Sequence, residues 1–305
     1  MKTRILLVGV LLVAEAGVLF SQAQEPTPAR LEINVVNVPL IVTVTDSKGQ
    51  LITGLKKEAF KILEDARPQK TQTFAHETDL PLSIVLLVDI SSSTFSQLEF
   101  ERQAARDFFS KVLKTGKDRA AIVGFESKPI LIADFTDDQS ALTAGLKKLS
   151  AGGSSGVYDA VYEAVDKKLS KEAGERRKVV ILISDGFDTA SNYSLMEATE
   201  KAQKNDALIY AISVNKISNS SKDERRDGDK AIKQLTEETG GKAFYPEKLT
   251  ELGAEFAKIE EELRSQYVLS YIPMNPFNGT YRKIRVDMSD RKFKAKTRSG
   301  YYATK

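Results

Sequence analysis

The chain has 305 residues, of which 41% are hydrophobic and 29% are charged, so it is long enough for one large or two modest domains with a real core. Its 45 basic and 42 acidic residues give a formal net charge of +3, which provides no general attraction to nucleic acid or to an anionic membrane. Because there is no cysteine and only one histidine, His76, disulfides and zinc–thiolate sites are excluded, and at most one imidazole base is available.

The first 23 residues have the pattern of an export signal. Lys2 and Arg4 precede an apolar run over residues 5–20, and residues 21–23 (Ser-Gln-Ala) place small side chains at the two positions that a signal peptidase reads. An uncleaved membrane anchor is the alternative, but the run is short for a membrane span and contains Glu15. We therefore expect an exported protein, periplasmic or extracellular, with no membrane span after cleavage.

Residues 24–80, after the signal, predict a polar linker and then β-structure. Apolar residues alternate with others from Val36 to Val44, which is the period of a strand, and residues 46–49 (Asp-Ser-Lys-Gly) form a turn signal. Residues 267–305 are strand-like again. Each end segment alone is too short to bury a face, so the simplest assembly pairs the two into one small β-sandwich.

Between these ends, residues 81–266 alternate apolar strands with amphipathic helices. In the first helix, expected over residues 97–114, Phe100, Ala104, Phe108 and Val112 form one apolar stripe. A later helix is expected over residues 230–238. This order predicts an α/β fold with a doubly wound, mostly parallel sheet, beside the small β-sandwich.

Basic residues alternate with apolar ones in the last strands, as in Lys283 and Arg285 against Ile284 and Val286. A basic face of this kind could bind an anion or a polysaccharide. A solvated strand face is the simpler interpretation, and we favour it.

Polar residues follow two of the buried strands, at the sheet edge where open α/β folds bind ligands. Asp89, Ser91 and Ser93 form a D-x-S-x-S pattern after the first strand, and Ser-Asp-Gly at 184–186 follows a later one. A glycine-rich loop, residues 152–156, lies between them in the sequence. Each motif alone is also typical of turns and helix caps. Together they predict a site for a hard divalent cation, which takes oxygen ligands and keeps an open position for water or an acidic group.

The D-x-S-x-S pattern, the glycine-rich serine loop and the later S-D-G resemble the metal-ion-dependent adhesion site of von Willebrand factor type A domains, over roughly residues 81–266. The two ends, which include VTVTDSKGQLITG and YRKIRVDM, resemble a bacterial family of exported proteins related to these domains. The resemblance implies Mg²⁺ (or Mn²⁺ or Ca²⁺) held by Asp89, Ser91, Ser93, Ser155 and Asp185. The family usually has threonine where Ser155 stands, and the neighbouring Ser154 is the alternative.

The resemblance also implies a non-enzymatic binding or adhesion protein whose cation coordinates a Glu or Asp carboxylate of a protein partner, with no nucleic-acid partner. A metal-dependent scaffold or assembly helper for an envelope complex is an alternative. A serine hydrolase is a remote one, since Gly152, Ser154 and Gly156 fit G-x-S-x-G but no strand is expected before the serine and His76 precedes it. The sequence has no Walker-type loop, which argues against nucleotide binding.

Overall fold

The computed structural model describes residues 37–76, 80–218, 220–274 and 278–303, within a compact unit that begins at Val36. The predicted export signal and the linker after it lie outside the described residues. Within the described part of the chain, no helix combines the length and the apolar character that a membrane-spanning segment requires.

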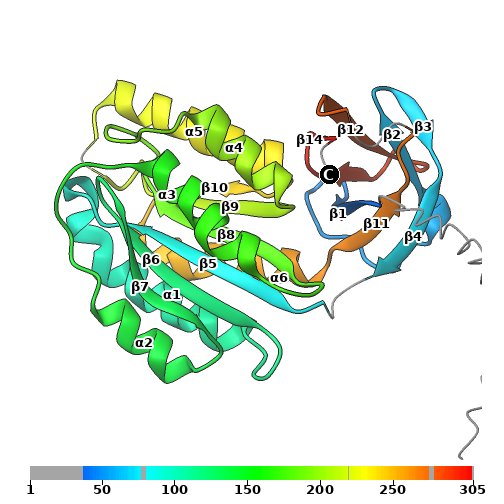
Figure 1. Cartoon of the computed structure of the whole chain (residues 1–305). Helices are drawn as coiled ribbons and strands as arrows, with labels where there is room; N and C mark the ends of the chain where they lie inside the picture. Colours follow the sequence, from blue (N-terminus) through cyan, green and yellow to red (C-terminus); the bar gives the residue numbers. More distant parts are fainter. Residues whose placement is uncertain (1–36, 77–79, 219, 275–277, 304–305) are drawn as a thin grey trace, which may run out of the picture. The chain divides into compact units, whose positions relative to one another are not determined.

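A six-stranded sheet lies at the centre of the α/β part (Figure 1). The strand order is β10-β9-β8-β5-β6-β7, and all neighbours are parallel except β6 and β7. The bounds are β5 (Leu82–Asp89), β6 (Arg119–Phe125), β7 (Pro129–Thr136), β8 (Arg177–Ser184), β9 (Ala207–Ser213) and β10 (Ala243–Phe244). β5 and β9 are buried along their whole length, as expected for strands covered on both faces.

Helices cover both faces of this sheet. The helices on one face are α1 (Leu98–Val112), α2 (Gln139–Lys147) and α6 (Leu252–Arg264), and those on the other are α3 (Val157–Glu163), α4 (Leu195–Lys204) and α5 (Lys222–Thr239). Alternate residues of the strands enter the two cores: Leu86 packs in the first and Leu87 in the second. The predicted doubly wound, mostly parallel sheet is confirmed.

The segments before and after the α/β part form two four-stranded antiparallel sheets, in the orders β13-β1-β11-β4 and β14-β12-β2-β3. The bounds are β1 (Val38–Thr45), β2 (Phe60–Glu64), β3 (Arg67–Gln69), β4 (Thr71–His76), β11 (Tyr267–Tyr271), β12 (Tyr281–Met288), β13 (Lys294–Lys296) and β14 (Gly300–Tyr302). A third hydrophobic core, which includes Leu40, Tyr267 and Val286, joins them. The flanking β-sandwich is therefore built from both ends of the chain, as predicted.

Glu262, close to the end of α6, connects this β-sandwich to the α/β part. Its Oε1 atom accepts hydrogen bonds from the hydroxyls of Thr43 at 3.1 Å and Tyr210 at 3.0 Å, and it pairs with Lys296 at 2.6 Å. Thr43 and Lys296 belong to β1 and β13, whereas Tyr210 belongs to β9. This buried carboxylate therefore has a full set of partners from three separate strands.

Several local predictions were wrong. α5 begins at Lys222 rather than at residue 230, because Ser221 and Glu224 form a capping box ahead of a highly charged first turn. β7 was missed because it is an edge strand, with Ile130 and Leu131 nearly half exposed, and lacks a continuous buried run. The single histidine, His76, lies at the end of β4.

The predicted stripe of α1 was also wrong in one position. Phe100 is 46% exposed, whereas Glu101, next to it, is 1% exposed. The buried face of the helix runs through Leu98, Glu101, Ala105 and Phe108. Ala104, Phe108 and Val112 of the predicted stripe are buried as expected, so the difference is confined to the first turn of the helix.

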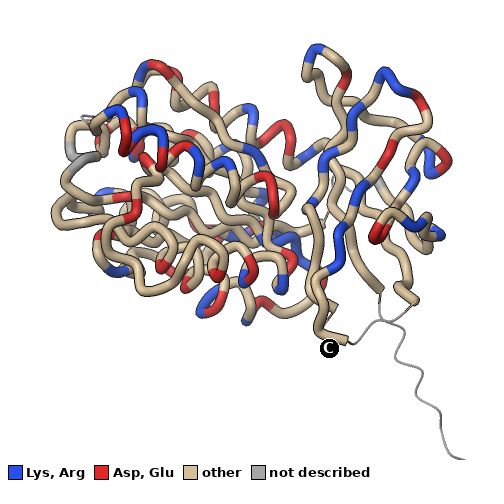
Figure 2. Tube along the Cα trace, turned by 90° about the horizontal axis from the view of Figure 1, so that it is seen from above, with Lys and Arg blue, Asp and Glu red and all other residues tan. Residues whose placement is uncertain are grey.

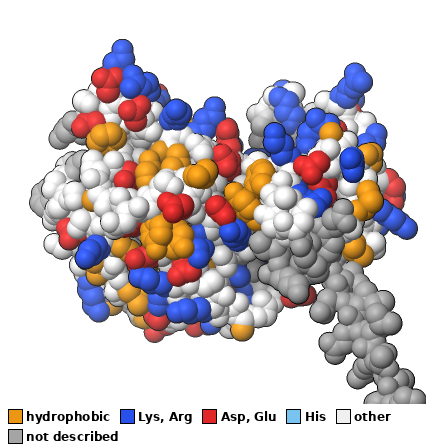
Figure 3. Space-filling view, turned by 45° about the horizontal axis from the view of Figure 1, so that its top comes forward, with side chains coloured by type: hydrophobic (Ala, Val, Ile, Leu, Met, Phe, Trp, Pro, Cys, Tyr) orange, Lys and Arg blue, Asp and Glu red, His pale blue; other side chains and the backbone are white. Residues whose placement is uncertain are grey.

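Lys283 and Arg285 of β12 lie on a solvated face. Ile284 and Val286 are buried, whereas Lys283 and Arg285 are exposed, and Arg285 pairs with Asp287 at 2.9 Å. Figure 2 shows Lys and Arg interspersed with Asp and Glu along the chain, and on the face in Figure 3 hydrophobic side chains form small groups between charged ones. These observations favour the interpretation of a solvated strand face over an anion-binding one.

Candidate metal site

The carboxylate of Asp89, at the end of β5, brings the three loops predicted from the sequence together. Asp89 is fully buried, and its Oδ2 atom accepts hydrogen bonds from the hydroxyls of Ser155 at 3.1 Å and Ser184 at 2.7 Å. Its Oδ1 atom accepts from the backbone N–H of Ser91 at 3.0 Å. Ser155 and Ser184 are 66 and 95 residues away in sequence, so only the parallel order of the strands places them here.

Short hydrogen bonds hold the first loop in shape. The hydroxyl of Thr94 donates to the carbonyl oxygens of Asp89 at 2.7 Å and Ser91 at 3.0 Å. The glycine-rich loop is tied to it, because Ser92 donates to the carbonyl of Gly153 through both its backbone N–H and its hydroxyl. The two loops therefore form one hydrogen-bonded unit at the carboxyl end of β5.

The third loop is held by α5. Asp185 follows β8, and its carboxylate accepts from the N–H of Phe187 at 3.1 Å and from the hydroxyl of Ser220 at 3.1 Å. Gly186 has a φ of +75°, and a Cβ there would lie 2.6 Å from the carbonyl of Gly228 in α5. The helix can approach Asp185 this closely only because both positions are glycine.

Burial raises the pKa of Asp89 to about 6, because a charged carboxylate loses its hydration in the protein interior. The hydrogen bonds from Ser91 and Ser184 oppose this shift, and the negative charge of Asp185 adds to it. In the described part of the chain, no lysine or arginine pairs with Asp89. The ionised form of Asp89 therefore has hydroxyl and amide donors around it but no compensating positive charge.

The donors at this edge suit a hard divalent cation that binds oxygen. The described residues contain no group of three or more His, Cys, Asp or Glu side chains that could hold a metal by themselves. Any cation here must therefore use the carboxylates of Asp89 and Asp185 together with hydroxyls and water. Such a mixed set is typical of Mg²⁺, which keeps several waters in its protein sites.

Four of the five predicted site residues lie at this edge. Ser91 and Ser155 each donate a hydrogen bond to the carboxylate of Asp89, and Asp185 acts on Asp89 through its charge. Ser93 lies in a 3₁₀ turn (Ser92–Gln97), but its side chain is outside the described part. Between the two candidate serines, Ser155 turns toward Asp89, whereas Ser154 is exposed.

Three residues of the site were missed from the sequence. Ser184 and Ser220 bind the two carboxylates, and Thr94 holds the first loop. Ser184 could have been found, because it directly precedes Asp185 at the end of an apolar strand. No local signal points to Ser220, which reaches Asp185 from the start of α5.

The geometry also bears on the hydrolase alternative. The glycine-rich loop follows α2 rather than a strand, so the strand–serine–helix turn of a nucleophile elbow is not formed at Ser154. Ser155 donates its hydroxyl proton to Asp89, and the single histidine belongs to β4 in the β-sandwich.

Comparison with curated proteins finds no match. Among solved structures, an aerotolerance-related membrane protein from Bacteroides fragilis is 14% identical, with a TM-score of 0.48 over 60% of this chain and 98% of that one. BatB from Bacteroides thetaiotaomicron is 13% identical, with a TM-score of 0.48 over 60% of this chain and 100% of that one. Proximal thread matrix protein 1 of the mussel byssus, in a form with a zinc-occupied MIDAS motif, is 17% identical, with a TM-score of 0.51 over 66% and 49%. At these identities the likeness concerns the fold alone.

The sequence profile of the von Willebrand factor type A domain matches residues 83–258, which is more than half of the chain. Domains of this type are typically non-catalytic modules that bind protein partners. The matched region contains nearly all of the central sheet, its helices up to the middle of α6, and the three loops around Asp89. The chain therefore belongs to the von Willebrand factor type A domain family.

Proposed function

We propose that this chain is an exported, non-enzymatic binding protein that grips an acidic residue of a protein partner through a divalent cation. Asp89, Ser91, Ser93, Ser155 and Asp185 are the proposed ligands, directly or through water. Mg²⁺ is the proposed ion, with Mn²⁺ or Ca²⁺ as substitutes.

One observation carries this proposal: the approach of Ser155 to Asp89. The hydroxyl of the glycine-rich loop lies 3.1 Å from the carboxylate of the first loop, at the sheet edge that also carries Asp185. A buried carboxylate surrounded by neutral oxygens suits a hard cation better than it suits any other ligand class. The related mussel byssus protein has been described with zinc in its MIDAS motif, which supports a divalent ion for the same fold.

The ligand set explains why the partner should supply an acidic group. Two carboxylates neutralise a divalent cation without making the site strongly negative, and the serine hydroxyls add oxygens without adding charge. When bound, the ion supplies a Lewis-acidic position that attracts a further carboxylate. The protein's part is to hold its oxygens on rigid strand ends so that the partner's Glu or Asp completes the set. Metal and partner then strengthen each other's binding by the same factor.

Export is proposed from the first 23 residues and the absence of cysteine, which suits an oxidising compartment. The same binding activity would serve adhesion at a surface or the assembly of an envelope complex. An adhesive role predicts a partner outside the cell.

The first test is calorimetric titration of the full chain with Mg²⁺, using Asp89→Ala and the control Asp134→Ala. Asp134 is an exposed aspartate of β7 that pairs with Lys168 at 2.9 Å. It lies beside the amino end of β6, whereas the three loops lie at the carboxyl edge of the sheet. We expect Asp89→Ala to lose Mg²⁺ binding and Asp134→Ala to keep it, with both variants folded by circular dichroism. Equal Mg²⁺ binding by Asp89→Ala and the wild type would refute the metal site.

The second test addresses the partner. Cross-linking in envelope and secreted fractions, with Mg²⁺ or with EDTA, should recover a protein only when the metal is present and Asp89 is intact. Replacing the acidic residue that the cross-link maps to the site should abolish capture. Equal capture of the partner protein in EDTA and in Mg²⁺ would show that the cation does not hold the partner.

A further inference from the structure

Two polar side chains at the start of α1 are buried without hydrogen-bond partners. Gln97 and Glu101 are each 1% exposed. Within the described residues, neither the amide of Gln97 nor the carboxyl of Glu101 makes a hydrogen bond. Buried polar groups are nearly always paired, so an unpaired carboxyl in the interior indicates an ordered water, an ion or a functional role.

The other buried carboxylates of this chain show that the fold normally satisfies such groups. Glu64 accepts hydrogen bonds from the hydroxyls of Tyr271 at 2.6 Å and Tyr301 at 3.0 Å. Glu262 is bonded by a lysine and two hydroxyls, as described above. Among the eight acidic residues that are buried in the described part, Glu101 is the one without a hydrogen bond or an ion pair.

Packing does not require a carboxyl at this position. The adjacent Phe100 is 46% exposed, so the helix leaves an aromatic ring in water while it buries an acid. Burying an unpaired acid in place of an available apolar side chain costs stability. A burial that lowers the stability of the folded state points to a role beyond folding.

Glu101 lies on the buried face of α1, close enough to the candidate metal site for the charge of Asp89 to act on it. Helix α1 begins directly after the loop of Asp89 and Ser91, and Leu98, one turn before Glu101, shares a core with Ile90. Burial raises the pKa of Glu101 well above its usual range, and the charge of Asp89 raises it further. The guanidinium of Arg102 opposes this shift, but Arg102 itself bonds to Glu99 and to the carbonyl of Leu149.

We propose that Glu101 is a third acidic group of the metal site, which acts on the cation from the buried face of α1 without touching it. This inference rests on the proposed function, and it assigns Glu101 as a positioning residue that raises metal affinity. The positive charge of a bound cation favours the ionised form of Glu101. That negative charge then adds to those of Asp89 and Asp185, so the protein holds the cation more tightly before any partner arrives. Groups that act on a metal from outside its ligand set typically change its affinity by about 10- to 100-fold.

The experiment compares Mg²⁺ binding with thermal stability in the full chain. Glu101→Gln keeps the shape and removes the charge, whereas Glu101→Met replaces the unpaired oxygens with an apolar group. Glu262→Gln is the control, because it changes another buried glutamate that has partners. Calorimetry measures the Mg²⁺ affinity, and melting is followed in EDTA and in Mg²⁺.

We expect Glu101→Gln to bind Mg²⁺ about tenfold more weakly. We expect Glu101→Met to melt at a higher temperature than the wild type in EDTA and to lose much of its stabilisation by Mg²⁺. Glu262→Gln should melt lower in both conditions and keep its Mg²⁺ affinity.

Wild-type Mg²⁺ affinity in Glu101→Gln, or a lower melting temperature of Glu101→Met in EDTA, would overturn the inference and leave the proposed function standing. A wild-type chain that does not bind Mg²⁺ at all would overturn both. The two failures are therefore distinct.

Discussion

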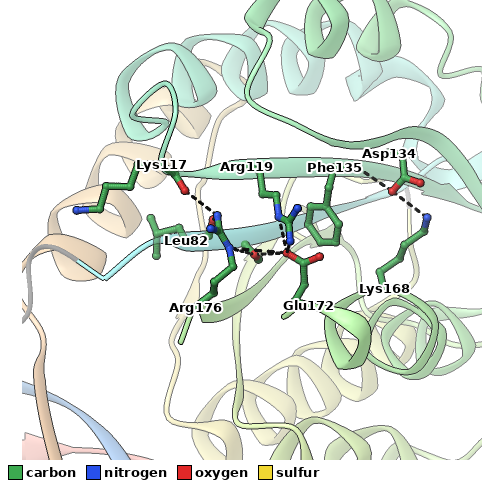
Figure 4. A network of polar contacts seen from close by, with 9 residues as sticks. Leu82, Lys117, Arg119, Asp134, Phe135, Lys168, Glu172 and Arg176 are labelled. Atoms are coloured by element: carbon green, nitrogen blue, oxygen red, sulfur yellow. Dashed lines mark hydrogen bonds and ion pairs between the residues drawn. The ribbon is translucent and has the colours of Figure 1, made fainter. Parts of the chain in front are cut away.

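At the amino ends of β5, β6 and β8, opposite charges pair with one another (Figure 4). Glu172 accepts from the hydroxyl of Ser83 at 2.5 Å and from Arg119 at 2.6 Å. Arg176 donates to Ser83 at 2.8 Å and to the carbonyls of Leu82 and Lys117 at 2.9 and 2.7 Å. Each of these groups has a partner of opposite charge or a backbone carbonyl.

At the carboxyl ends of the same strands, acidic groups gather without basic partners. Asp89 and Glu101 are fully buried, and no lysine or arginine of the described part forms an ion pair with either. The hydrogen bonds at this end come from serine hydroxyls and backbone N–H groups. Both edges belong to the same sheet, so the difference in charge pairing arises from the side chains at each edge and not from the backbone fold.

This contrast indicates that the side chains that stabilise the fold and those proposed to bind the cation lie at opposite edges of the same sheet. At the amino edge of the sheet, where the strands begin and the helices end, paired opposite charges stabilise the fold. Charges that are left uncompensated at the carboxyl edge lower stability, and they create the need for a cation. Substitutions at the two edges should therefore respond differently to Mg²⁺.

The largest effect is expected at the amino edge. Asp118 has a fully buried carboxylate that accepts from the N–H of Leu82 at 2.8 Å and of Lys114 at 3.0 Å and pairs with Arg264 at 2.6 Å. Asp118→Ala leaves that guanidinium and two backbone donors without their acceptor, so it should lower the free energy of unfolding by about 4 kcal/mol. Urea unfolding should give the same loss in EDTA and in Mg²⁺. A loss that differs between the two would contradict the separation of the edges.

The next effect is a pH dependence at the carboxyl edge. Because the folded pKa of Asp89 is raised from 3.8 to about 6, the folded state binds a proton more readily than the unfolded state between these values. Stability in EDTA should therefore fall as pH rises from about 4 to 6, by up to about 3 kcal/mol for this group. The measurement is the free energy of unfolding at both ends of this window in the wild type and in Asp89→Asn. The amide cannot titrate, so the difference between wild type and variant should shrink at low pH, and a constant difference would argue against the shift.

The smallest effect is expected for Ser155→Thr. Threonine keeps the hydroxyl that reaches Asp89, so Mg²⁺ affinity should stay close to that of the wild type, whereas Ser155→Ala should bind the ion more weakly. Calorimetric titration of both variants checks this, and the alanine variant controls for changes in packing. Similar losses in both would indicate that the shape of the loop matters more than the hydroxyl oxygen.

The sequence by itself determined the architecture and most of the candidate ligands. Fully apolar runs such as the one ending at Asp89 predict buried parallel strands, because a strand covered on both faces has no polar side to expose. D-x-S-x-S and S-D-G directly follow such runs, so their place at the carboxyl edge follows from local order alone. The pairing of the two β-rich end segments could also be predicted from the sequence, because neither segment is long enough to bury a sheet face by itself.

Only the tertiary structure decided which side chains meet. Ser155 rather than Ser154 reaches Asp89, and Ser184 joins them, because strand order brings together positions 66 and 95 residues apart. The first turn of α1 buries Glu101 and exposes Phe100, and this depends on how the helix packs against the sheet and not on its own period. Local sequence patterns indicate which face of a helix or strand is apolar. Contacts between residues far apart in sequence form only when the elements pack together. The polar side chains of this site meet through contacts of the second kind.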